Sequence, residues 1–207
     1  MTTYRGLQVL DVVMPDRAAG IDHEFLRPMN VLANPLGRER FRAKFGGQRQ
    51  GYTFRWICPT RASKGVLRDW IDTHRGAAIP FWVPTYARDL VVYEAGLSTA
   101  EAIKIERTEY TRQMYANGLH RRHIAIWESG TTPARFRGVT SSVELADYEQ
   151  IGIDDSLGVS ITTSTLLSFL LLVRLAEDLI QIEHHGPEFA VAEVPLIELP
   201  AEVPLPV

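Results

Sequence analysis

The feature that most constrains the fold is the apolar run from Leu166 to Ala176, which only Ser168 and Arg174 interrupt. The run is too short to cross a membrane as a helix, because a spanning helix needs about 20 apolar residues. A continuous apolar run of this length is typical of a core strand. We therefore predict a core strand at Leu166–Leu175, followed by strands at Leu179–His184 and Glu188–Leu199.

The composition is that of an ordinary globular protein. The 207 residues, of which 45% are hydrophobic, suffice for one large domain or two small ones. A net charge of −3, from 22 basic and 25 acidic side chains, gives no global electrostatic reason to bind nucleic acid or an anionic membrane. The single cysteine, Cys58, excludes an intrachain disulfide framework and a zinc site of several thiolates, which fits a reducing cytoplasm. The first residues lack the layout of a secretion signal, so we expect an unprocessed chain.

The first third of the chain predicts two alternating strands and a helix. After an opening strand at Gln8–Val13, apolar side chains alternate in Arg40–Phe45 and again in Tyr52–Cys58, which predicts a hairpin that turns within 46–51. Helical spacing then predicts a helix over Arg61–Arg75, with Thr60 as its N-cap and Gly76 as its end. Its apolar stripe contains a tryptophan, so we expect the helix to lie on a sheet.

Short strands separated by polar turns predict a distinct middle segment. A strand is also expected at Ile79–Val83, and another at Leu90–Tyr93. Beyond Gly96 the predicted elements are Ala102–Glu106, a helical turn near Thr108–Tyr115, Arg122–Glu128, Arg135–Ser141 and Glu149–Ile153. We predict that residues 96–165 form an inserted small β module, and that residues 1–95 together with 166–207 form one discontinuous β domain. The predicted fold class is mainly β with one principal helix.

The sequence lacks the motifs of common active sites. It contains no Gly-rich phosphate loop, nucleophile elbow, paired-histidine zinc helix or calcium loop. His184 and His185 are adjacent on a predicted strand and would face opposite ways, which does not suit a shared metal ion. Asp154 and Asp155 precede a Ser-Leu-Gly turn, and Cys58 lies at a strand end as an inert buried thiol. We expect no enzyme activity, no catalytic residue, no cofactor and no metal.

Basic residues and a proline-rich arm are the predicted contact surfaces. Arginines crowd the predicted hairpin opposite its apolar face, which favours a subunit contact or a solvated face over phosphate binding. The phrase Glu193–Leu196 recurs as Glu202–Leu205, where the flanking prolines predict an extended arm. The predicted subunit-contact residues are Arg38, Arg40, Arg42, Arg49, Val203 and Leu205.

Two blocks resemble the distal tail proteins at the tail tip of long-tailed bacteriophages. The first is Gly65–Ile71 with His74–Pro84 and Asp89, which resembles the short helix, glycine turn and Phe- or Trp-rich strand of those proteins. The second is Leu172–Asp178 with the apolar residues up to Val194, which resembles their closing strands. The two blocks cover about half of the chain, on either side of the middle segment.

The resemblance implies a tail-tube-like β-sandwich or split barrel with one helix and an inserted small β-barrel module. It implies a virion structural protein that forms a ring, hexameric in this family, between the tail tube protein and the baseplate hub and fibre proteins. No membrane or specific nucleic acid would be a partner, although tail DNA passes through such a ring. Two other hypotheses stay open: a carbohydrate-binding module that uses Trp127 or Tyr148, and a hydrolase that uses Asp178, Glu183 and His184.

Overall fold

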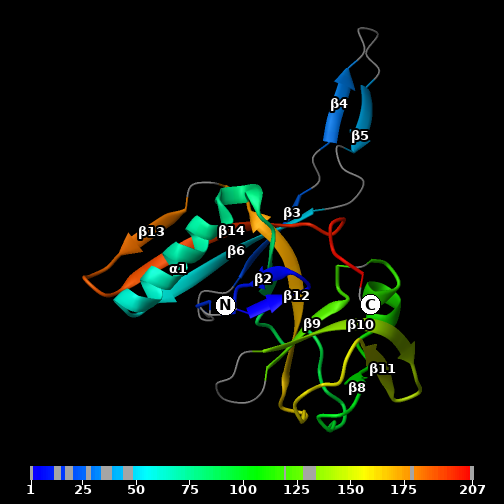
Figure 1. The fold of residues 1–207 in the computed structure, drawn as a ribbon. Coiled ribbons are helices and arrows are strands. Elements are labelled where there is room, and N and C mark those ends of the chain that lie inside the picture. Colours follow the sequence, from blue (N-terminus) through cyan, green and yellow to red (C-terminus); the bar gives the residue numbers. More distant parts are fainter. Residues whose placement is uncertain are drawn as a thin grey trace.

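The structure, a computed structural model, is a mainly β protein with one principal helix, as predicted (Figure 1). It describes residues 2–11, 15–16, 21–26, 29–33, 39–43, 49–118, 120–127, 134–177 and 180–205, and no side chain between residues 26 and 49. Within these residues no helix is both long and apolar enough to span a membrane.

Most strands belong to one curled, open sheet. Along its main path the order is β1 (Thr2–Tyr4), β2 (Leu7–Val9), β7 (Phe81–Pro84), β12 (Leu166–Leu175), β9 (His123–Trp127), β10 (Arg135–Glu144), β11 (Tyr148–Ile153) and β8 (Ala102–Glu106). A branch leaves β12 through β14 (Ala190–Glu198), which pairs with both β13 (Gln181–His184) and β6 (Arg49–Cys58); β6 also pairs with β3 (Asp22–Leu26).

Strand β12 has the predicted bounds and joins the parts of the sheet. Its first residues, Leu166–Phe169, pair with β9, while Leu170–Val173 pair with β7 and Val173–Leu175 pair with β14. In Figure 1 it runs between the α1 side of the molecule and the middle segment. Side chains of β12 are buried on both faces of the sheet, which explains why its sequence is continuously apolar rather than alternating.

The strands before and after the middle segment share one sheet. Eight residue pairs join β6 and β14, from Ala190 opposite Cys58 to Ile197 opposite Gly51. β7 pairs with β12. The strands of residues 96–165 join the same sheet through β9, and their buried side chains belong to the same apolar cluster. The division of the chain into two domains stays a prediction.

The predicted hairpin between residues 40–45 and 52–58 is wrong. Strand β5 (Glu39–Ala43) pairs with β4 (Met29–Ala33) in a separate two-stranded sheet, whereas β6 pairs with β14 and β3. Alternation tells which face of a strand is buried, but it does not select the partner strand. The largest ring of β6 aligns with a small residue of β14, since Trp56 lies opposite Ala192.

Helix α1 (Arg61–His74) confirms the predicted helix and both of its ends. The Thr60 hydroxyl accepts a hydrogen bond from the Ser63 amide, and the Ser63 hydroxyl accepts one from the Thr60 amide, so a capping box starts the helix. Arg75 ends it in the left-handed region at φ 48°. Trp70 is buried and meets the Phe81 ring of β7 edge-on at 4.4 Å, so the helix does lie on the sheet.

Three predictions of the sequence are realised in altered form. Leu90–Tyr93 makes single bridges, from Leu90 to Leu167 and from Val92 to Ile105, rather than a strand. The helical turn near residues 108–115 is a π-helix over Thr111–Tyr115, and a short 3-10 turn, Gly76–Ala78, follows α1. The opening strand ends at Val9.

Candidate functional site

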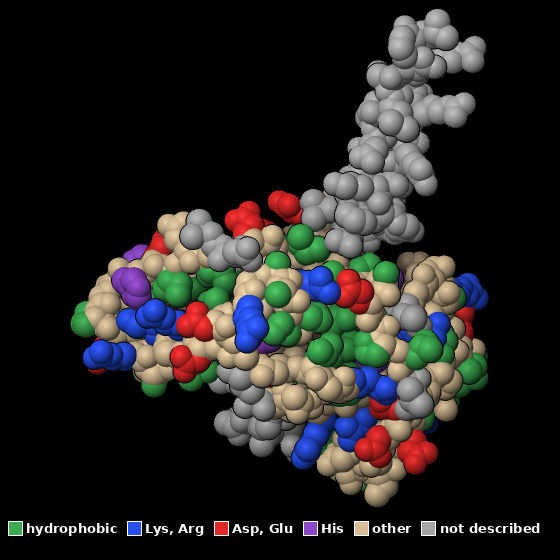
Figure 2. All heavy atoms as spheres, turned by 45° about the horizontal axis from the view of Figure 1, so that its top comes forward, with side chains coloured by type: hydrophobic (Ala, Val, Ile, Leu, Met, Phe, Trp, Pro, Cys, Tyr) green, Lys and Arg blue, Asp and Glu red, His purple; other side chains and the backbone are tan. Residues whose placement is uncertain are grey.

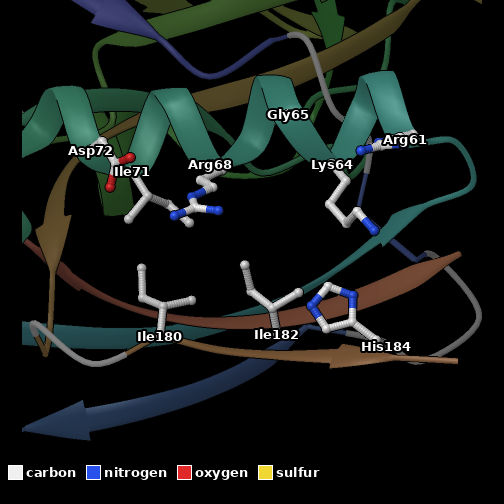
Figure 3. Close-up of a pocket in the computed structure, with 9 residues that line it drawn as sticks. All are labelled: Arg61, Lys64, Gly65, Arg68, Ile71, Asp72, Ile180, Ile182 and His184. Carbon is white, nitrogen blue, oxygen red and sulfur yellow. The ribbon is translucent and has the colours of Figure 1, made fainter. Parts of the chain in front are cut away.

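A concave surface lies between α1 and β13 (Figure 3). It is a groove of about 620 Å³, with Ile180, Ile182 and His184 on its β13 side and Ile71 and Asp72 on its helix side. Figure 3 shows the β13 side chains pointing towards the helix. Alternation along the strand explains this, because every second side chain of β13 faces the same way.

Three cations stand along the helix side of the groove. Arg61, Lys64 and Arg68 are separated by three or four positions and therefore share one face of α1. No described residue forms a salt bridge with any of them, although the Lys64 ammonium lies 3.5 Å from the Pro187 carbonyl. Figure 2 shows basic side chains beside apolar ones and histidine at this end of the molecule. The groove can thus hold an anionic group above an apolar floor.

The predicted C-terminal arm folds back onto its own chain. Val203 is 7% exposed and belongs to the core, whereas Leu205 is 61% exposed. The Pro204 carbonyl lies 2.9 Å from His123 Nε2, and the Leu205 carbonyl accepts a hydrogen bond from Arg5 at 3.0 Å. Of the two arm residues predicted as subunit contacts, only Leu205 therefore presents its side chain at the surface of this chain.

A cluster of polar residues holds the arm against the first hairpin and the middle segment. Arg5 also forms a salt bridge with Asp154 at 2.5 Å, and the other carboxylate oxygen of Asp154 accepts a hydrogen bond from the Gly138 amide at 2.9 Å. The Tyr4 hydroxyl lies 2.9 Å from His123 Nδ1. Burial lowers the pKa of His123 to about 4 and raises the pKa of Tyr4 to about 12. Asp154, which was predicted to lie in a turn, thus links distant segments of the chain.

A second buried pair joins the middle segment to β14. Arg121 donates to Glu198 at 2.6 Å and to the Tyr52 hydroxyl at 3.0 Å, and it also reaches Gln50 at 2.8 Å. Burial raises the pKa of Glu198 above its ordinary value, and the neighbouring guanidinium opposes that rise. These charges are paired with one another, so they support the fold rather than form a site.

The predicted arginine contacts cannot be placed as side chains. Arg38 lies outside the described residues, and the side chains of Arg40, Arg42 and Arg49 are likewise not described. Their backbones belong to β5 and to the start of β6. The whole set of subunit contacts therefore stays a prediction.

The residues considered for catalysis do not converge. Glu183 and His184 are exposed neighbours on β13 and face opposite sides, and Asp178 lies outside the described residues. Glu183 lies 3.6 Å from His185 instead. Among the residues whose placement is described, no cluster of three or more His, Cys, Asp or Glu could hold a metal ion. Cys58 is buried, which raises its pKa and makes the thiol a poor nucleophile.

The aromatic residues considered for sugar binding differ in access. Trp127 is buried and packs on Tyr86, so its face is not free to stack on a ligand. Tyr148 stacks on the half-exposed Tyr93 at 5.3 Å, with the Lys104 ammonium on its ring. Carbohydrate binding by the middle segment stays a prediction, and of its two aromatic candidates Tyr148 is the one with an exposed neighbouring ring.

Sequence reasoning missed the groove, although its cations carry a signal. Arg61, Lys64 and Arg68 recur at helical spacing opposite the apolar stripe, which alone indicates an ordinary solvated face. Their significance depends on the β13 strand, which is more than 100 residues away in sequence and which pattern alone does not bring under the helix.

Comparison with protein-family models and with curated proteins found no match for this chain.

Proposed function

We propose that this chain is a structural protein of a bacteriophage tail tip, which self-associates into a ring of six copies between the tail tube and the baseplate hub and fibres. The observation that supports self-association is the open sheet. Within the described residues, β1 pairs only with β2 and β3 pairs only with β6, so each leaves one edge of backbone donors and acceptors unpaired. Such edges are sealed in many proteins by a neighbouring subunit.

An exposed apolar side chain marks one of these edges. Phe25 on β3 is 63% exposed, and its ring lies 4.6 Å from His23, which in turn stacks on Tyr52. A large exposed aromatic beside an unpaired strand edge is a feature of subunit interfaces, because burial of both in one contact removes apolar surface and satisfies the backbone. A contact between two different edges repeats head to tail and can close into a ring.

The resemblance to tail-tip proteins supports the phage assignment, and the fold brings its two blocks together. The first block forms α1 and β7, and the second forms the end of β12 with β13 and β14. Phe81 of the first block lies opposite Val173 of the second, and the Asp89 carboxylate accepts a hydrogen bond from the Phe169 amide at 2.7 Å. One contiguous half of the molecule thus carries the resemblance, and the proposed location is the virion.

Mass photometry and negative-stain imaging of the purified chain test the proposal. We expect rings, and we expect Phe25→Asp to reduce the species to monomers while far-UV circular dichroism stays unchanged. Leu97→Asp is the matched control, because Leu97 is also exposed, at 73%, but lies in the middle segment. A chain that stays monomeric at high concentration, alone and with tail tube and hub proteins, would contradict the proposal.

A further inference from the structure

We propose that the groove between α1 and β13 binds an acidic, extended segment of a partner protein, which adds to the edge of β13 and places its carboxylates against Arg61, Lys64 and Arg68. The inference does not depend on ring formation, because β1 and β3 offer other open edges. It concerns a binding partner that differs from a second copy of this chain.

The shape of the groove admits a peptide without rearrangement. Ile71, Ile180 and Ile182 are half-buried and give an apolar floor, above which about 620 Å³ of space is open. Gly65 lies on the helix side of this space, and a Cβ built there would meet no atom within 4 Å. Glycine is among the weakest helix formers, and no packing constraint requires it here. Its effect is to keep the groove wide at this point.

The charges of the groove select an anion. Arg61 and Lys64 stand in the first turn of α1, where no acidic residue balances them and where the helix dipole is already positive. Cations in the first turn destabilise a helix, so folding alone does not favour them there. Arg68 continues the same face, and Asp72 is the one acid among the groove's described lining residues. Several carboxylates along an acidic ligand would satisfy these cations and the dipole together.

The backbone of β13 favours an extended ligand. Within the described chain β13 pairs with β14 alone, so its other edge has unpaired amides and carbonyls (Figure 1). In a strand added at this edge every second side chain would face α1. Glutamates at those positions would lay their methylene groups on Ile180 and Ile182 and extend their carboxylates to Arg61 and Arg68. The expected ligand therefore has acidic residues at alternate positions.

A second copy of this chain fits the edge less well. His23 lies opposite Tyr52, and the register through β6 and β14 places His23 and Ile182 on the same face of the sheet. Glu24 therefore lies on the other face, as Glu183 does. If β3 of a second copy continued the sheet at β13, these two carboxylates would lie on the same face of the joined strands, where like charges repel.

Fluorescence anisotropy with a blocked, labelled peptide that alternates glutamate and threonine tests the inference on the full chain. We expect binding that weakens at high salt, and little binding of the matching glutamine peptide. Arg68→Glu should lower the affinity about fivefold or more, whereas the control Arg135→Glu, also an exposed arginine reversed to glutamate, should change it less than about twofold. Gly65→Leu should block the groove and weaken binding while helix content is retained.

Hydrogen exchange supplies the second readout. The glutamate peptide should slow exchange of amides within Gln181–His184, because an added strand would hydrogen-bond the free edge of β13. A merely electrostatic contact with α1 would not protect these amides. Three results would overturn the inference: equal binding of the glutamine peptide, equal effects of Arg68→Glu and Arg135→Glu, or binding of anionic lipid vesicles in place of the peptide. Loss of self-association in Arg68→Glu without any peptide binding would assign the groove to a second copy. Rings that form normally alongside a failed peptide titration would refute this inference and leave the proposed function standing.

Discussion

Acidification should destabilise this protein through His123 in particular. The side chain is fully buried at the start of β9, between the Tyr4 hydroxyl at Nδ1 and the Pro204 carbonyl at Nε2, each at 2.9 Å. A carbonyl oxygen only accepts hydrogen bonds, so Nε2 carries the proton and Nδ1 accepts from Tyr4. Protonation of Nδ1 would remove that acceptor and place a charge in the core. It would also place that charge close to Arg5.

The magnitude follows from the pKa. Burial lowers the pKa of His123 from its ordinary 6.5 to about 4, while the hydrogen bond to Pro204 opposes that change. The unfolded chain therefore binds the proton more readily between these two values, so stability falls as the pH falls from about 6.5 to about 4. At about 1.4 kcal/mol for each pH unit, the free energy of unfolding loses about 3 kcal/mol over this range. Above pH 6.5 this contribution is fully retained.

Urea unfolding at several pH values measures the effect against a variant without the imidazole. His123→Gln keeps a donor for Pro204 and cannot titrate, so it should be less stable than the natural chain at pH 7 and lose less stability on acidification. His184→Gln, at an exposed position, is the control and should follow the natural chain throughout. Equal losses in the natural chain and in His123→Gln, or a His123 NMR resonance that titrates near pH 6.5, would refute the reasoning.

Three further predictions concern the core, the buried ion pair and the arm. Trp70→Ala should lower the free energy of unfolding by about 3–5 kcal/mol in urea titrations, because it empties the contact between α1 and the sheet. Arg121→Met should cost about 3–5 kcal/mol at pH 7, since Glu198 stays buried without its partner, and the loss should shrink at a pH low enough to protonate Glu198. Val203→Asp should lower the melting temperature of the chain by several degrees, whereas Leu205→Asp should leave it unchanged and weaken self-association measured by mass photometry.

The sequence was sufficient to predict the bounds of elements whose signals are local. β8 and β12 have the predicted bounds, and α1 begins and ends where Thr60 and Gly76 indicate, because capping and periodicity depend on neighbours in the chain. The hairpin before Tyr52 was mispredicted because strand pairing depends on distant segments. β6 pairs with β14, whose Ala192 lies opposite Trp56, and a pattern within 40–58 cannot encode that choice.

The surface features were less predictable than the core for the same reason. Asp154 reads as a turn residue in sequence, yet its carboxylate binds Arg5, which lies 149 positions away. Val203 reads as part of a free arm, yet it completes the core. The spacing of the groove cations indicates only a solvated helix face, because the sequence does not show that β13 lies beside them. Each of these roles is set by a contact between segments that are distant in sequence.

Two sets of arginines differ in how their charges are satisfied within the described chain. Arg5 and Arg121 are each largely buried and each pairs with a carboxylate of the same chain, because an unpaired charge in the core would destabilise the fold. Arg61 and Arg68 form no salt bridge with any described residue and border an apolar floor that the chain itself leaves open. High salt should therefore weaken binding at the groove strongly, while the buried pairs, which are poorly screened, should keep their contribution to stability. A chain whose unfolding free energy and peptide affinity fell together with added salt would show that this division between structural and recognition charges is mistaken.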